Sequence, residues 1–268
     1  MPSKLEPRVL IVEDEPDMNN LLAEVLSAYG FGSIQAGDAE QALAALDRET
    51  PDAILLDLML PGMSGLELCN LLKTSRSKRT IPIIILTALD RPVDQRHGFE
   101  TGADDYMTKP FTPEGLVARL QACLDQCLDA RQSCGNLQRT IDLGVALADL
   151  KVINTLATCL YCFTEFTPRE IETLRSGLMG LSDEASQWSA TRRGASPVKM
   201  SVDLNKERLQ VRFRPAAGAE AAAFVAEHLD PEAAVPSSFT DAGLIDQMRS
   251  EEGELVMEKV LPPQGAAS

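Results

Sequence analysis

The sequence predicts an α/β protein in which a doubly wound, five-stranded parallel sheet is followed by a helical connector and an α+β domain with an antiparallel sheet. Over residues 8–124, apolar strand-like runs alternate with helical patterns, which is typical of a parallel sheet wrapped by helices. Beyond residue 145, two helical stretches precede segments in which apolar and polar residues alternate. The 268 residues also suffice for two domains of ordinary size.

The first domain is predicted to contain strands at five apolar runs, of which the second is weak. These are Arg8–Val12, Ser33–Ala36, Ala53–Asp57, Ile83–Thr87 and Asp105–Thr108, and helices are expected near 17–29, 39–48, 64–74, 93–101 and from 113 onward. Three of these runs contain four consecutive apolar residues (Val9–Val12, Ala53–Leu56 and Ile83–Leu86), as strands buried on both faces of a sheet should. In such a sheet the reactive site lies beyond the carboxyl ends of the strands.

The last of these helices is predicted to continue as a connector over residues 129–144. Apolar or small residues recur at alternating four- and three-residue steps, the spacing of a coiled-coil seam: Leu116, Leu120, Cys123, Cys127, Ala130, Cys134, Leu137 and Ile141. Gly135 and Gly144 interrupt this seam, and cysteine and alanine pack it weakly. A homodimer through the connector is one interpretation, and a helix face packed on its own domain is the other.

The second domain, residues 145–262, is predicted to open with helices at 145–163 and 168–188. A β-hairpin is expected over 199–213, because apolar and polar residues alternate on both sides of the turn Asn205-Lys-Glu207. A short helix near 243–250 and a final strand Glu254–Leu261 complete the domain. The tail 263–268 is predicted to be disordered.

The charge balance argues against nucleic acid as a partner. The net charge is −15, with 25 Lys and Arg residues against 40 Asp and Glu residues, and neither half is basic. A phosphate backbone repels such a chain. No apolar run approaches the ~20 residues of a membrane span, and Met1–Leu5 lacks the apolar core of a signal peptide. We therefore expect a cytoplasmic protein whose cysteines are reduced.

Three carboxylates are predicted to meet at the carboxyl edge of the parallel sheet. Glu13 and Asp14 follow the first strand, and Asp57 ends the third. Like charges this close raise each other's pKa unless a cation neutralises them, and oxygen ligands in a partly hydrated cluster suit Mg²⁺. Thr87 ends the fourth strand and Lys109 follows the fifth. A carboxylate, a divalent metal, a lysine and a hydroxyl are the groups needed to form an acyl phosphate.

Four segments that contain these residues resemble the receiver domains of two-component response regulators, which are CheY-like and flavodoxin-like in fold. They are Val9–Pro16, Leu55–Gly65, Leu86–Ala88 and Gly102–Phe111, within a receiver domain at 1–128. The resemblance implies that Asp57 is the phosphoacceptor. It also implies that Asp14, Asp57 and the backbone carbonyl of Met59 bind Mg²⁺ directly, and that Glu13 binds it through water.

The same resemblance implies roles for the residues around the acceptor. Thr87 and Lys109 would bind the phosphoryl group, Tyr106 would swing inward with Thr87 as a switch, and the small Ala88 would leave room above Asp57. The receiver would catalyse its own phosphorylation and dephosphorylation. Its phosphodonor would be a sensor histidine kinase or a phosphotransfer protein.

Two families resemble the second half. Phe166–Ala185 is similar to the opening of the LuxR/NarL helix-turn-helix, which would make the protein a DNA-binding transcription factor, but the predicted hairpin stands where its recognition helix should follow. The order of two helices, a hairpin, Asp230-Pro-Glu232, Gly243-Leu-Ile245 and a last strand resembles the histidine-kinase-like ATPase fold, in particular its anti-sigma-factor serine kinase branch. A different α+β fold is the remaining alternative.

The nucleotide-binding motifs of that ATPase fold are altered in this chain. The segment that would hold its catalytic glutamate and Mg²⁺-binding asparagine is Met179–Asp183, its adenine-binding stretch is Arg214–Gly218, and its lid glycines are reduced to Asp241-Ala-Gly243. The resemblance therefore predicts a nucleotide-free output domain that binds a regulatory protein. An active ATP-dependent serine kinase is the alternative within the same fold.

Overall fold

The computed structural model describes two compact units, Met1–Leu128 and Asp129–Ser268, each with its own core. The described residues are 6–75, 77–88, 96, 98–132, 137–143, 147–163, 166–191, 198–205, 207–216, 221, 223, 245–251 and 254–261. Within these ranges, no helix is long and apolar enough to cross a membrane.

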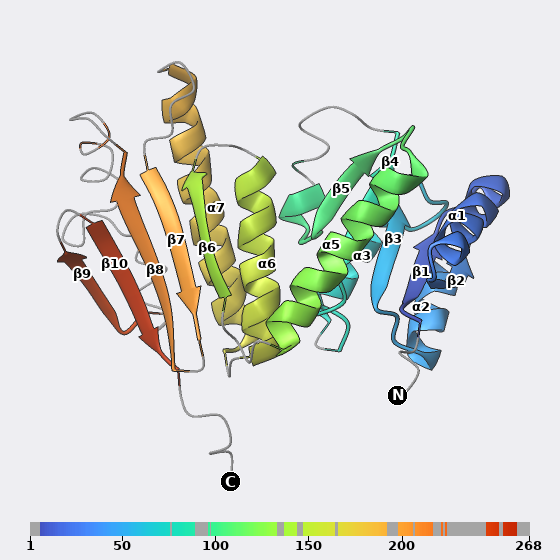
Figure 1. The fold of residues 1–268 in the computed structure, drawn as a ribbon, viewed down its shortest axis with the longest axis horizontal. Coiled ribbons are helices and arrows are strands. Elements are labelled where there is room, and N and C mark those ends of the chain that lie inside the picture. The colour runs from blue at the N-terminus through green and yellow to red at the C-terminus, as the bar shows by residue number, and fades with distance from the viewer. Residues whose placement is uncertain are drawn as a thin grey trace, which may run out of the picture. The chain divides into compact units, whose positions relative to one another are not determined.

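The first unit contains the predicted five-stranded parallel sheet, with strand order β2-β1-β3-β4-β5 (Figure 1). The strands are β1 (Arg8–Val12), β2 (Gly32–Ala36), β3 (Ala53–Asp57), β4 (Ile83–Thr87) and β5 (Asp105–Thr108), and the helices are α1 (Pro16–Ala28), α2 (Ala39–Arg48), α3 (Gly65–Thr74) and α5 (Pro113–Gln132). This part of the predicted fold class is confirmed. Most of the helix expected near 93–101 lies outside the described residues.

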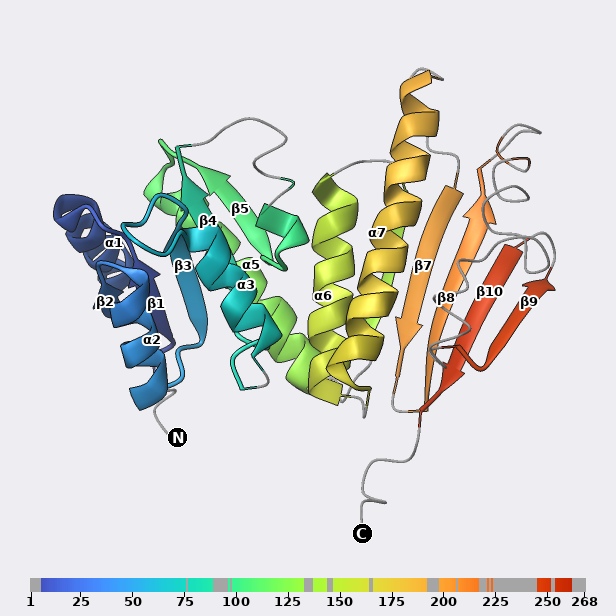
Figure 2. The ribbon, with the colours of Figure 1, turned by 180° about the vertical axis from the view of Figure 1, so that it is seen from behind.

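Both faces of the parallel sheet are covered, as its apolar strands require. Helices α1 and α5 lie on one face, where their apolar side chains pack on alternate residues of β1, β3 and β4, and α2 and α3 lie on the other (Figures 1 and 2). Helix starts are fixed locally. Asp38 caps α2 by accepting a hydrogen bond from the Gln41 backbone, and Ser64 and Glu67 form a capping box at α3.

The prediction that the connector is helical is wrong for residues 137–143. Helix α5 ends at Gln132, and residues 137–143 form strand β6 (Leu137–Leu143), which pairs antiparallel with β7 (Val198–Leu204). The apparent seam has a different cause at each end. Leu116, Leu120 and Cys123 are buried in the core of the first unit, so this helix face packs on its own domain. The side chains of Cys127, Ala130 and Cys134 lie outside the described residues.

The second unit is an antiparallel sheet of order β6-β7-β8-β10-β9 with two helices against one face (Figures 1 and 2). Its helices are α6 (Leu147–Phe163) and α7 (Pro168–Thr191), and its other strands are β8 (Arg208–Pro215), β9 (Gln247–Glu251) and β10 (Glu254–Val260). The two helices, the hairpin and the final strand are confirmed. The core contains the alternate residues of β7, β8 and β10 that point toward the helices, including Met200, Phe213 and Met257.

The prediction of a helix near 243–250 is wrong for the residues of this segment that the structure describes as regular, because 247–251 form strand β9. This strand pairs antiparallel with β10, with Arg249 opposite Val256 and Gln247 opposite Glu258. The ladder to β10 satisfies its backbone groups, which outweighs the helical preference of so short a segment. The Asp230-Pro-Glu232 loop, Gly243 and Leu244, and the tail 263–268 lie outside the described residues.

Candidate active site

The predicted site residues lie at the carboxyl ends of the parallel strands. Glu13 and Asp14 follow β1, Asp57 and Thr87 are the last residues of β3 and β4, and Lys109 follows β5. Because β1, β3 and β4 are in parallel register, their ends meet at one edge of the sheet. One carboxylate oxygen from each of Glu13, Asp14 and Asp57 lies within 4.8 Å of the others.

Lys109 joins two of these carboxylates. Its Nζ donates hydrogen bonds to Glu13 Oε2 at 2.6 Å and to Asp57 Oδ2 at 2.5 Å. The Lys109 backbone N–H donates to the Thr87 carbonyl at 2.7 Å, which holds the start of this loop beside the end of β4. The peptide bond Lys109-Pro110 is cis. The ammonium group therefore supplies positive charge between two acids that would otherwise repel each other.

Burial differs sharply among the three acids. Glu13 and Asp57 are only 3% and 6% exposed, whereas Asp14 is exposed. Burial raises the pKa of Glu13, and the charge of Asp57 adds to this effect, although the hydrogen bond from Lys109 opposes it. Burial alone would lower the pKa of Lys109, but its hydrogen bonds to Asp57 and Glu13 outweigh burial and raise that pKa. Lys109 is therefore held in its charged form.

Two residues without a sequence-predicted role shape the backbone of the site. Asn19, on the buried face of α1, donates through Nδ2 to the carbonyls of Glu13 at 2.9 Å and Ala36 at 3.0 Å, which fixes the end of β1. Gly65 begins α3, and a Cβ at this position would lie 2.0 Å from the Asp57 carbonyl oxygen. Both residues could have been found from the sequence. Asn19 is a polar residue at helical spacing from the apolar Leu22 and Leu26, and Gly65 is a glycine at the start of a predicted helix.

The loop after β3 approaches the acceptor closely. The Met59 backbone N–H donates to Asp57 Oδ1 at 3.0 Å, and the Gly65 N–H donates to the Leu58 carbonyl at 3.0 Å. These bonds hold the segment between β3 and α3 against the carboxylate. The Met59 side chain is 63% exposed, so this residue contributes to the site through its backbone.

The predicted switch residues are both buried. Thr87 is fully buried and Tyr106 is 6% exposed, while Ala88 is exposed. The Tyr106 ring lies so close to Gly98 that a Cβ on this glycine would be 3.1 Å from a ring carbon. In the β4–β5 ladder Tyr106 is opposite Ile85, and Thr87 is opposite Thr108. The tyrosine is thus in an inward position in this structure.

The chemistry available at this edge follows from these contacts. Asp57 offers a carboxylate oxygen that forms an ion pair with the ammonium group of Lys109. A positive charge at this place can stabilise the equatorial oxygens of a phosphoryl group. Three acids within 4.8 Å of one another are a donor set of the kind that Mg²⁺ prefers.

The first part of the chain is similar to known proteins. A family model described as the response regulator receiver domain matches residues 9–121. The phosphate regulon transcriptional regulatory protein PhoB of Klebsiella pneumoniae is 47% identical over 117 residues, which are 44% of this chain and 51% of that protein. The chemotaxis response regulator CheY4 of Vibrio cholerae, a solved structure, is 29% identical with a TM-score of 0.43, over 44% of this chain and 98% of that one.

The similarity to one relative extends past the receiver domain. The alkaline phosphatase synthesis transcriptional regulatory protein PhoP of Bacillus subtilis is 37% identical over 172 residues, which are 63% of this chain and 71% of that protein. Several other curated relatives, PhoB among them, are matched over about half of their length. On this evidence the chain belongs to the response regulator family, and its first unit contains the receiver domain.

Proposed function

We propose that this response regulator accepts a phosphoryl group on Asp57. We further propose that the phosphorylated receiver controls a nucleotide-free, kinase-like domain that binds a regulatory protein. The observation that supports phosphorylation of Asp57 is its buried carboxylate, 2.5 Å from the ammonium of Lys109. The donor would be a sensor histidine kinase or a phosphotransfer protein. The proposal places the chain in the cytoplasm, where its cysteines would be reduced.

The residues of the site divide the work of phosphoryl transfer. Asp57 would attack the phosphorus in line while the bond between phosphorus and the donor's imidazole nitrogen breaks, and the imidazole would leave with that electron pair. Lys109 would move its hydrogen bond from the carboxylates to a phosphoryl oxygen. The hydroxyl of Thr87 would donate a hydrogen bond to a second phosphoryl oxygen. The small side chain of Ala88 would leave room for the phosphoryl group above Asp57. Mg²⁺, held by Glu13, Asp14, Asp57 and the Met59 carbonyl, would neutralise charge on the transferred group. The receiver would in this way catalyse its own phosphorylation and dephosphorylation.

The output of the switch would pass through Thr87 and Tyr106. Both side chains are buried at the edge formed by β4 and β5, so a change at one displaces close-packed neighbours. Phosphorylation would shift an existing equilibrium between two packings of this edge, and the second unit would respond to that shift.

Two features of the second unit support the proposal of a kinase-like output domain that does not bind nucleotide. Helices α6 and α7, the β7–β8 hairpin and β10 follow in the order expected of that fold. Met179 stands where the ATPase would carry its catalytic glutamate, and its side chain packs against the hydrophobic core. A thioether in a core cannot accept a proton from a nucleophile.

The output domain is therefore expected not to bind ATP. Calorimetric titration of the full chain with Mg²⁺-ATP should show no heat above dilution at high micromolar concentrations, because the altered motifs leave the nucleotide without a catalytic base or a glycine-lined adenine site. An active anti-sigma-type serine kinase of the same concentration is the positive control. Saturable micromolar binding would show that the domain is a nucleotide-binding kinase and would exclude a nucleotide-free output.

A DNA-binding output is the second candidate, and the names of the relatives favour it. PhoB and PhoP are named as transcriptional regulatory proteins, and MtrA of Mycolicibacterium smegmatis as a DNA-binding response regulator. In this chain, however, the stretch that resembles a helix-turn-helix opening lies in one continuous helix, α7 (Pro168–Thr191). A helix-turn-helix requires a break between its two helices. Salt-dependent DNA binding by the full chain would decide for this second candidate.

A further inference from the structure

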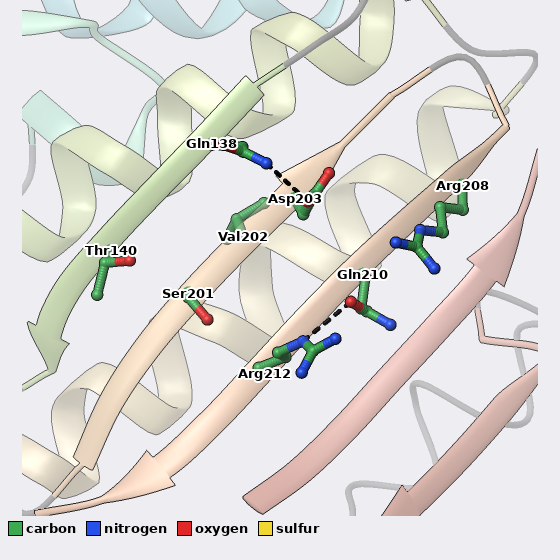
Figure 3. Close-up of a pocket in the computed structure, with 8 residues that line it drawn as sticks. All are labelled: Gln138, Thr140, Ser201, Val202, Asp203, Arg208, Gln210 and Arg212. Carbon is green, nitrogen blue, oxygen red and sulfur yellow. Dashed lines mark hydrogen bonds between the residues drawn. The ribbon is translucent and has the colours of Figure 1, made fainter.

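The sheet of the second unit has a mostly polar face opposite α6 and α7, here called the open face, on which Gln210 and Val256 are buried. Its side chains form rows that cross the strands, because residues in register on neighbouring strands point to the same side. One row contains Gln138, Asp203, Gln210, Glu258 and Gln247, the next contains Thr140, Ser201, Arg212, Val256 and Arg249, and the third contains Asp142, Lys199 and Arg214. A pocket of about 340 Å³, here called the hollow, is lined mainly by side chains of the first two rows, and Figure 3 labels the residues that line it.

The row at the Asp203 end of the hollow is internally satisfied. Asp203 Oδ2 accepts from Gln138 Nε2 at 2.9 Å, and its Oδ1 accepts from Asn205 Nδ2 at 3.5 Å. Glu258 lies 3.7 Å from Arg208 and 3.0 Å from Arg249, so one carboxylate is shared between two guanidinium groups. The charge of Glu258 is thus compensated by arginine, whereas Asp203 is held by the neutral amides of Gln138 and Asn205.

The third row is satisfied as well. Lys199 lies 3.7 Å from Asp142, and Arg214 forms an ion pair with Glu254. Each basic side chain of this row has an acidic partner on a neighbouring strand. Such pairs hold the two charges together and leave little field above the sheet.

The middle row differs at Thr140, Ser201 and Arg212, whose side chains have donors that no described acidic group accepts from. Arg212 donates from Nε to Gln210 Oε1 at 2.9 Å, which orients the guanidinium and leaves both terminal nitrogens available. Within the part of the chain that the structure describes, Arg212 forms no ion pair, and the hydroxyls of Thr140 and Ser201 make no hydrogen bond. Arg212 is opposite Ser201, and Ser201 is opposite Thr140, so the three donors lie in line.

We propose that the hollow on the open face binds a small molecule through a phosphate group. The terminal nitrogens of Arg212 form a fork that fits two oxygens of an oxyanion, and the hydroxyls of Ser201 and Thr140 can donate to the others. Arg208, Arg212 and Arg249 outnumber Asp203 and Glu258 here, and Arg212 has no acidic partner among the residues that the structure describes. A hollow of about 340 Å³ has the size of a small-ligand site. This site is separate from Asp57 and from the proposed protein-binding function.

The test is a titration of the isotopically labelled full chain with inorganic phosphate, followed by nuclear magnetic resonance. Mg²⁺ is omitted and ionic strength is kept constant with chloride, so that general charge screening does not change. Saturable shifts in the millimolar range are expected for the amides of Thr140, Ser201 and Arg212 and for the Arg212 Nε–H. Glycerol phosphate should give the same pattern, whereas acetate should give much weaker shifts.

Arg212→Gln is expected to weaken phosphate binding by about tenfold or more, because it removes a pair of charge-assisted hydrogen bonds. Arg214→Gln is the matched control, since it removes the same group from the same face of β8 but from an existing ion pair, and it should change the affinity less than about twofold. Ser201→Ala is a second variant, which removes one of the proposed hydroxyl donors to phosphate and has little effect on packing. The proposal is overturned if no saturable shifts occur, if acetate binds as well as phosphate, or if both arginine variants lose binding equally.

Discussion

Asp57→Asn is expected to reduce phosphoryl incorporation from a small phosphodonor and Mg²⁺ to background, while the wild-type chain gains one phosphoryl group. The bond in question is an acyl phosphate, which should be stable in acid and labile in alkali. The carboxamide of asparagine lacks the anionic oxygen that attacks phosphorus. Its shape still permits a hydrogen bond from Lys109, so the folded structure should persist, as circular dichroism would verify. Intact-protein mass spectrometry measures the incorporation.

Asp47→Asn is the matched control for this experiment. Asp47 lies on α2, has a side chain that is 72% exposed and forms a surface ion pair with Lys78, so its loss should leave incorporation unchanged. Labelling that persists in Asp57→Asn would place the phosphoryl group on another residue. Loss of labelling in Asp47→Asn as well would point to a general loss of structure.

Gly65→Ala is expected to destabilise the receiver by about 3 kcal/mol and to slow phosphorylation, because a methyl group here collides with main chain. The added Cβ would lie 2.0 Å from the Asp57 carbonyl oxygen and 2.7 Å from Leu58 Cα. Neither atom belongs to a flexible side chain, so the segment carrying the phosphoacceptor must shift. Denaturant unfolding measures the change in stability, and incorporation from the phosphodonor measures the change in activity.

Gly180→Ala is the same substitution in a place with open space. Apart from the backbone of α7 itself, no atom of the described residues lies within 4 Å of the Cβ that would be added at Gly180, which is inside α7. Alanine favours a helix interior by about 0.5–1 kcal/mol over glycine, so this variant should be as stable as wild type or more stable. Equal stability of the Gly65 and Gly180 variants would contradict the close approach of α3 to Asp57.

The receiver could be predicted from the sequence because its central strands β1, β3 and β4 are almost entirely apolar and its acids lie at the ends of β1 and β3. The positions of Asp57 and Lys109 at strand ends then follow from parallel register alone. The connector could not be predicted in the same way. Leu116, Leu120 and Cys123 have the same spacing in a coiled coil as in a helix that packs on its own sheet.

Strands β6 and β9 were missed for a different reason. Leu137 and Ile141 are four residues apart, which fits one helix face and also one strand face, since four is a multiple of two. Strand β9 lies at the edge of the sheet and contains only one large apolar residue, Met248. Such strands depend on a partner far along the chain, so their short-range pattern is weak. The alignment of Thr140, Ser201 and Arg212 in the middle row likewise depends on the register between strands that are far apart in the sequence.

Hydrogen exchange of the full chain, with and without phosphorylation, tests most directly whether Asp57 controls the second unit. Mass spectrometry would follow amide protection across both units in the wild type and in Asp57→Asn. We predict that phosphorylation changes protection around Thr87 and Tyr106 and also within the described part of residues 137–261, and that neither change occurs in Asp57→Asn. Unchanged protection throughout 137–261 in the fully phosphorylated wild-type chain would contradict the claim that the receiver controls this domain.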